Sequence, residues 1–208
     1  MFTNQWVLSF PFQLRFLFAS RPQLMGRVLG IVYRAISSHL IQKAGFTRKT
    51  TQAGAVTLIQ RFGSALNLNV HVHMLFLDGV YTETQHVRTR FQRTNGPEQQ
   101  ELIELVHTIS YRVAGFLERE GILERDEENS YLNLDDADED SIQQVLGCSV
   151  SYRIAVGPQQ GRKVFTLQTI PSWEDDDRFF QVAKASGFSL HAGVTAQAWE
   201  RQKLERQY

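Results

Sequence analysis

The order of secondary-structure elements predicts an α+β fold, in which helices pack on one face of an antiparallel sheet. Three observations indicate this: a β-branched and aromatic segment at residues 5–10, a helical apolar period at residues 24–45, and two strand-like segments at residues 55–62 and 70–81. With 208 residues, of which 42% are hydrophobic, the chain can bury one substantial core. We therefore expect residues 1–208 to form a single domain.

Residues typical of element boundaries identify the end of the first strand and the start of the first long helix. The segment QWVLSF stops at Pro11, which cannot donate a hydrogen bond to a neighbouring strand. Ser20-Arg21-Pro22 is typical of a helix start, with Ser20 as the N-cap and the proline in the first turn. Apolar residues then recur at intervals of three and four up to Gly45, which predicts a long amphipathic helix.

A hairpin and a second long helix follow. The connection GSALNLN contains a glycine and two asparagines, the residues of a turn between paired strands. We expect a palm made of residues of about 5–81 and 187–208, and an insertion of about 82–171. The remaining predicted elements, in order, are a polar loop at 82–97, a helix at 98–118, an acidic loop at 124–140, a short helix at 141–146, a hairpin of 149–156 and 163–167, a strand at 188–194 and a helix at 195–208.

Charge and cysteine content exclude several classes of protein. The 22 basic and 22 acidic residues balance, so the chain as a whole lacks the positive charge of many nucleic-acid binders. Cys148 is the only cysteine, which excludes a disulfide framework and a thiolate zinc site within this chain. No signal peptide or membrane-spanning segment is expected, and we predict a cytoplasmic protein.

Two histidines in the segment NLNVHVHMLFLDG are the first candidate site. Successive side chains of a strand alternate between faces, so His71 and His73 point to the same side. Gln60, near the end of the preceding strand, is the first candidate for a third metal ligand, and His191 is the second, as a ligand or a phosphate contact. A solvent-facing pair without metal is the alternative, and the residues alone leave both open.

Histidines combined with an amide oxygen suit Mg²⁺ or Mn²⁺, ions that polarise a phosphodiester. The nucleophile must then come from another residue, and tyrosine can form a covalent bond to phosphorus. Basic residues gather in the first half of the chain. The candidate contacts to a DNA backbone are Arg48, Lys49, Arg61, Arg88, Arg90 and Arg93.

The segments QWVLSFP, GAVTLIQRFGSALNLNVHVHMLFLDGVY and GFSLHAGV, the last followed by a helix ending in KLERQY, resemble the two-tyrosine HUH transposases of rolling-circle insertion sequences. HUH denotes His-hydrophobic-His, matched by His71-Val72-His73. The resemblance implies a ferredoxin-like or RRM-like palm, a divalent metal on the histidine pair and one polar residue, and single-stranded DNA of transposon ends as substrate. It also implies cleavage by a tyrosine that becomes joined to the 5′ phosphate, in a bacterial protein that is nucleoid-associated when acting.

Two departures from that family bear on function. Its members usually begin with a cysteine-rich zinc-binding domain, which this chain lacks, and their catalytic tyrosines lie on a helix after the late strand. We expect a truncated catalytic domain in which either Tyr208 is the nucleophile or the nucleophile lies beyond the chain's end. The alternatives are a nucleic-acid-binding remnant without catalysis and, less favoured, an unrelated metallohydrolase.

Overall fold

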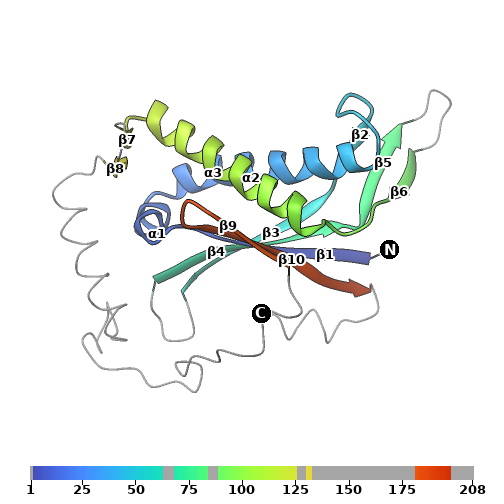
Figure 1. The fold of residues 1–208 in the computed structure, drawn as a ribbon, viewed down its shortest axis with the longest axis horizontal. Helices are drawn as coiled ribbons and strands as arrows, with labels where there is room; N and C mark the ends of the chain where they lie inside the picture. The colour runs from blue at the N-terminus through green and yellow to red at the C-terminus, as the bar shows by residue number, and fades with distance from the viewer. Residues whose placement is uncertain (1, 63–67, 84–88, 126–129, 133–180, 198–208) are drawn as a thin grey trace, which may run out of the picture.

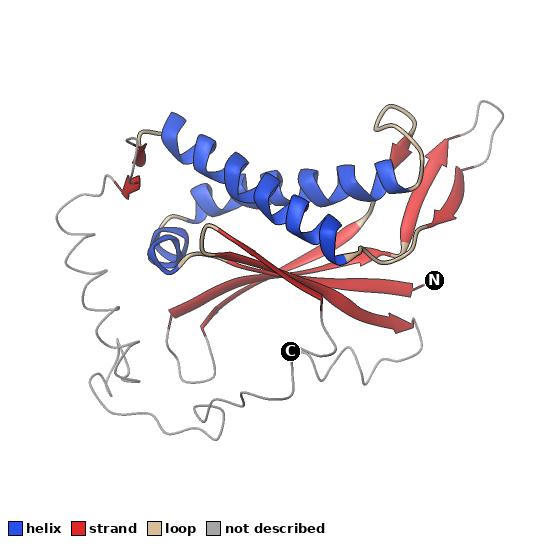
Figure 2. Ribbon diagram, viewed as in Figure 1, coloured by secondary structure: helices blue, strands red, loops and turns tan. Residues whose placement is uncertain are grey.

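The computed structural model describes residues 2–62, 68–83, 89–125, 130–132 and 181–197. Within these ranges, five strands form an antiparallel sheet in the order β3-β4-β1-β10-β9. Two long helices, α2 and α3, lie across one face of it (Figures 1 and 2). This arrangement confirms the predicted α+β fold with helices on one side of an antiparallel sheet.

The first strand of the chain is the central strand of this sheet, because β1 pairs with β4 on one side and with β10 on the other. A small second sheet in the order β2-β5-β6 and a short β7-β8 pair complete the described part. The bounds of the elements are β1 Phe2–Ser9, α1 Phe12–Ser20, α2 Pro22–Lys43, β2 Thr51–Gln52, β3 Ala55–Phe62, β4 Leu68–Leu77, β5 Gly79–Glu83, β6 Thr89–Arg93, α3 Gln99–Arg119, β7 Leu123–Arg125, β8 Ser130–Leu132, β9 Gln181–Ala185 and β10 Phe188–Gln197.

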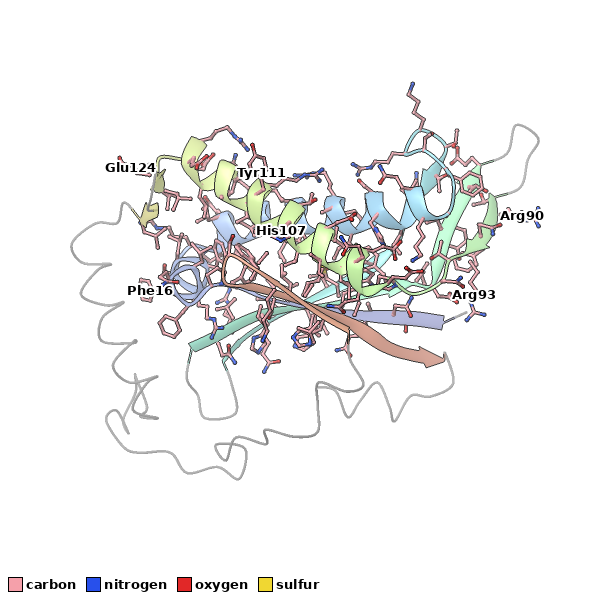
Figure 3. All side chains as sticks on the ribbon, in the orientation of Figure 1. Phe16, Arg90, Arg93, His107, Tyr111 and Glu124 are labelled. Atoms are coloured by element: carbon pink, nitrogen blue, oxygen red, sulfur yellow. The ribbon has the colours of Figure 1, made fainter. Side chains whose placement is uncertain are left out.

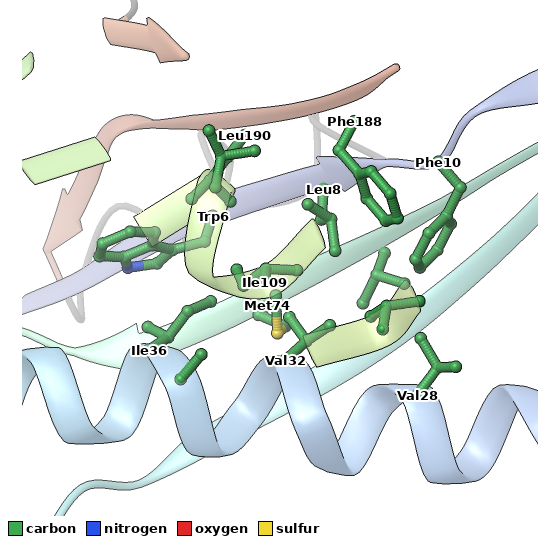
Figure 4. Close-up of a cluster of buried hydrophobic side chains, with 14 of the residues drawn as sticks. Trp6, Leu8, Phe10, Val28, Val32, Ile36, Met74, Ile109, Phe188 and Leu190 are labelled. Carbon is green, nitrogen blue, oxygen red and sulfur yellow. The ribbon is translucent and has the colours of Figure 1, made fainter. Parts of the chain in front are cut away.

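The core lies between the helices and the sheet. Along β1 and β4 alternate residues point to the helices, and Trp6, Leu8, Val72 and Met74 among them are fully buried. The helices supply the opposing apolar side chains, and β10 adds Leu190 (Figure 4). This alternation is what a sheet covered on one face requires.

The start of the first long helix differs from the prediction. Ser20 is the last residue of the helix α1 rather than an N-cap, and its hydroxyl donates to the carbonyl of Leu17. Helix α2 begins at Pro22 without a side-chain cap. The sequence signal for α1 is weak because the segment FQLRFLFAS has no clear polar face, yet it buries Leu14, Leu17 and Phe18.

The predicted loop at 82–97 is wrong in part, because Thr89–Arg93 is the strand β6, paired with β5. The predicted strand 70–81 divides at Asp78, where the chain leaves the large sheet for the small one. Asp78 is only 3% exposed and forms an ion pair with Arg93, at 2.8 Å between Oδ2 and Nε. A Cβ on Gly79 would lie 2.2 Å from the carbonyl oxygen of Gln92, so a residue without a side chain is required at this close crossing.

The predicted elements of the second half have mixed outcomes. The helix expected at 98–118 is α3, which packs on α2 and on β9 although it falls within the range expected to be an insertion. Strand β9 was not predicted, and residues 195–197, expected to begin a helix, extend β10 instead. The elements expected at 141–146, 149–156 and 163–167, together with Cys148, lie outside the described residues.

Candidate functional site on the open face of the sheet

The face of the large sheet that is turned away from α2 and α3 is called the open face here. Neighbouring residues in register have side chains on the same face, so the pairings define its members. The described members of the open face are Thr3, Gln5, Val7 and Ser9 of β1, Val56, Leu58 and Gln60 of β3, His71, His73, Leu75 and Leu77 of β4, Val182 and Lys184 of β9, and Ser189 and His191 of β10. None of them is an aspartate or a glutamate.

His73 lies between two glutamines on the open face. Gln5 of β1 donates its Nε2 hydrogen to Nδ1 of His73 at 3.2 Å, and Nε2 of His73 donates to Oε1 of Gln60 on β3 at 3.1 Å. Burial lowers the pKa of His73, so the ring is neutral at neutral pH. The structure thus brings Gln60 beside the histidine pair, and it adds Gln5, which the sequence reasoning missed.

Both glutamines lie where the strand register shifts. The β1–β10 register shifts between Gln5 and Trp6, and the β3–β4 register shifts between Gln60 and Phe62. A bulge re-aims the side chains next to it and is common beside functional sites. The β1–β4 register has no shift at Gln5, and the β3–β4 pairing is regular up to Gln60, so strand alternation already places both glutamines on the same face as His73.

One ring nitrogen of His71 is buried and forms no hydrogen bond among the described residues. This atom, Nδ1, is inaccessible to solvent. Burial, followed by the neighbouring His73 and Arg15, lowers the pKa of His71 to about 4. The ring is therefore neutral at pH 7, the state in which imidazole binds metal.

The residues fit a divalent ion in donor type. The ring centroids of His71 and His73 are 6.0 Å apart. Two imidazoles that bind one ion at about 2.1 Å have centroids within roughly 6.5 Å of each other. Two nitrogens with the amide oxygen of Gln60 make a mixed set suited to Mn²⁺ or Mg²⁺. Within the described ranges, no three residues of the His, Cys, Asp and Glu types lie close enough to hold a metal, so such a site needs this amide.

Arg15 is a second residue that the sequence reasoning did not place at the site. It lies on α1, and its Nη1 donates to Oδ1 of Asn69 on β4 at 2.8 Å, two residues before His71. Its Nε donates to the carbonyl of Phe10 at 3.0 Å. A half-buried guanidinium is thus fixed at the edge of the open face, next to the histidine pair. The sequence gives little indication of this role, because Arg15 is a single charged residue that only interrupts an apolar segment.

His191 lies on the open face but one strand away from the pair. Val7 of β1 is the register partner of both His73 and His191, so β1 separates the two histidines. Strands are about 4.8 Å apart, which places their backbones roughly 10 Å from each other. Gln60, whose strand is adjacent to β4, is therefore better placed than His191 to be the third ligand.

The predicted DNA-contacting cations do not form one group. Arg48 and Lys49 lie in the exposed turn that leads to β2, and Arg90 and Arg93 lie on β6 of the same small sheet (Figure 3). Arg93 is engaged by the buried Asp78. Arg61 is exposed on β3, next to Gln60 in the chain, and Arg88 lies outside the described residues.

None of the tyrosine side chains that the structure describes lies on the open face. Tyr33 donates to the carbonyl of Ala53 at 2.6 Å and stacks on Phe76, which points to the helices. Tyr81 packs on Phe91 in the small sheet, and Tyr111 is 74% exposed on α3, on the helix side (Figure 3). Tyr208, one of the two predicted sources of the nucleophile, lies outside the described residues.

No helix in the described ranges combines the length and apolar character that crossing a membrane would need. The family model described as "Putative transposase" matches residues 54–206, which include β3, the histidine pair and β10. Comparison with curated proteins and with solved structures gave no match.

Proposed function

The chain belongs to this family of transposases, enzymes that move DNA segments, and on that premise we propose that it cuts and rejoins single-stranded DNA on the open face of its sheet. The observation that carries the proposal is the meeting of His71, His73 and Gln60 on a face whose described residues include no carboxylate. A polyanion can approach such a face without meeting like charge.

His71, His73 and Gln60 would hold a divalent ion, Mn²⁺ or Mg²⁺. Such an ion supplies Lewis-acid polarisation of a phosphodiester and stabilises the negative charge that develops on its oxygens. The chain's own contribution is to keep both imidazoles neutral by burial and to fix His73 between Gln5 and Gln60. Binding through Nε2 of His73 would need the ring proton to move to Nδ1 and the amide of Gln5 to turn its oxygen toward it.

The proposed reaction is a transesterification. A tyrosine hydroxyl loses its proton and its oxygen attacks the phosphorus, the bond from phosphorus to the 3′ oxygen breaks, and the 3′ oxygen takes up a proton. The DNA is then joined to the enzyme through a 5′-phosphotyrosine, and attack by another 3′ hydroxyl reverses the step to complete strand transfer. Tyr208 is the proposed nucleophile.

Mn²⁺ titration tests the metal site. Isothermal titration calorimetry should detect binding to the full chain, and His71→Ala combined with His73→Ala should abolish it. His107→Ala, at an exposed histidine of α3, is the matched control and should bind as the parent does. Absence of binding to the parent, or unchanged binding to the double variant, would leave a nucleic-acid-binding module without catalysis.

Nicking of single-stranded DNA tests the nucleophile. With Mn²⁺ present, the chain should form a covalent protein–DNA adduct that survives denaturing electrophoresis. Tyr208→Phe should remove the adduct, and Tyr111→Phe, on the helix side, should leave it unchanged. An adduct that persists in Tyr208→Phe would assign the chemistry to another residue.

A further inference from the structure

We propose that Arg15, held by Asn69, binds a DNA phosphate beside the histidine pair. This inference rests on the proposed function and adds a substrate contact that neither the family match nor the strand pattern assigns. It concerns a side chain outside the five strands, contributed by α1.

The guanidinium of Arg15 is fixed by neutral groups. Nε donates to the backbone carbonyl of Phe10, Nη1 donates to the amide oxygen of Asn69, and Cζ lies 5.6 Å from the ring centroid of Phe12. These contacts orient the planar group, and no carboxylate among the described residues pairs with its positive charge. Burial lowers the pKa of Arg15, which reflects the cost of desolvating that charge.

An anion relieves this cost more effectively than water at a half-buried position. The planar guanidinium suits phosphate because several N–H groups point the same way, and Nη2 is not used by the contacts to Phe10 and Asn69. A phosphate bound by Arg15 would lie at the edge of the open face, near Asn69, which precedes His71 by two residues on β4.

A purely structural role for Arg15 would be to tie α1 to β4. The two roles differ in the salt dependence of DNA binding, since a lost structural contact lowers the melting temperature without changing the number of phosphates contacted. Each phosphate contact to a single strand contributes about 0.7 to the slope of log affinity against log salt.

The experiment measures binding of oligothymidylate to the full chain in EDTA at several salt concentrations. Arg15→Gln should lower the affinity by about 10- to 100-fold, the effect of one lost charged hydrogen bond. It should also reduce the salt slope by about 0.7. Arg112→Gln, at an exposed arginine of α3 on the helix side, should leave both unchanged. An Arg15→Gln variant with the parent's slope would overturn the proposal.

Two further measurements separate positioning from charge. Asn69→Ala should weaken binding by less than Arg15→Gln and keep the parent's slope, because the charge stays while its orientation is lost. In the unsubstituted chain, oligothymidylate should protect Arg15, and not Arg112, from phenylglyoxal, which does not depend on any variant folding. Equal modification of Arg15 with and without DNA would contradict the proposal.

The use of EDTA keeps this inference apart from the metal site. If the parent binds no Mn²⁺ but Arg15 still governs the salt slope, the metal proposal fails and the phosphate contact stands. If Mn²⁺ binding and nicking are present while Arg15→Gln binds DNA as the parent does, the phosphate contact fails alone.

Discussion

The two faces of the large sheet are built from the same strands and follow different rules. On the helix face, Trp6, Leu8, Val72 and Met74 are completely buried. On the open face, the residues between them are half-buried, and polar groups contact one another through His73. A face whose only role was solubility would carry a mixture of positively charged lysines and negatively charged glutamates.

The two faces show that alternate residues of each strand have different roles: one set fills the core and the other forms the candidate site. Each strand supplies the core with one set of side chains and the site with the other, so a residue and its neighbour in sequence serve different purposes. Besides apolar side chains and hydroxyl groups, the open face carries histidines, glutamines and a lysine, and no acid among its described members, although the chain has 22 acidic residues. Such a face would not repel a polyanion.

The largest contrast is expected in stability. Met74→Ala should lower the free energy of unfolding by about 2–5 kcal/mol, because it opens a cavity against the helices. Leu75→Ala, at the next residue and on the open face, should cost less than about 1.5 kcal/mol because the side chain is already half-exposed. Urea unfolding of the two variants measures the difference. Equal losses would show that the open face is covered like the other one.

The next contrast concerns metal binding. Gln60→Ala should weaken Mn²⁺ binding by about 100-fold, since it removes the amide oxygen that completes the donor set. Thr57→Ala changes the same exposed strand on its other face, where Thr57 pairs with Met74, and should bind Mn²⁺ as the parent does. Calorimetry distinguishes the two, and a normal affinity in Gln60→Ala would remove Gln60 from the site.

Gln5 should have a smaller effect. If His73 binds an ion through Nε2, its proton sits on Nδ1, and Gln5 must present its amide oxygen to accept it. Gln5→Ala should therefore weaken Mn²⁺ binding by about 10-fold, and Gln5→Glu should restore it because a carboxylate also accepts that proton. If Gln5→Glu binds no better than Gln5→Ala, the contact between Gln5 and His73 only packs the sheet.

The smallest expected effect is in the pH dependence of stability. Burial, then His73 and Arg15, holds the pKa of His71 at about 4, against an ordinary value of 6.5. The unfolded chain therefore binds a proton more readily, so the stabilising contribution is complete above about pH 6.5 and is lost as the pH falls toward 4.

Melting temperatures measured from pH 7 to pH 4 should fall less steeply for His71→Asn than for the parent. His107→Asn, on the exposed side of α3, is the matched control and should follow the parent. A His71→Asn curve parallel to the parent's would mean that His71 is as accessible to protons as in the unfolded chain.

Much of the fold could be read from local patterns, because the long helices and the strands near residues 5, 55 and 70 have strong periodicity. The pairing of His71 with Gln60 followed from a hairpin, which is a local connection. Arg15 and Gln5 could not be found in this way. Their contacts to Asn69 and His73 join segments that are far apart in the sequence.

Strands β9 and β6 were missed for related reasons. The segment QVAKA is short and has one charged residue, and it becomes a strand because β10 offers it a partner. The strand β6 is almost wholly exposed, so its sequence TRFQR lacks the alternation that reveals a half-buried strand. In each case tertiary contacts decided what local preference left undetermined.

The central position of β1 has a consequence for the order of folding. Strand β1 comes before both of its partners in the chain, β4 on one side and the much later β10 on the other. Such distant pairing raises the contact order, which slows folding because a long loop must close before the contacts form. The hairpin of β3 and β4, with His71, His73 and Gln60, can form early during translation. The row that runs from His73 through Val7 to His191 is completed only when the ribosome has passed residue 191.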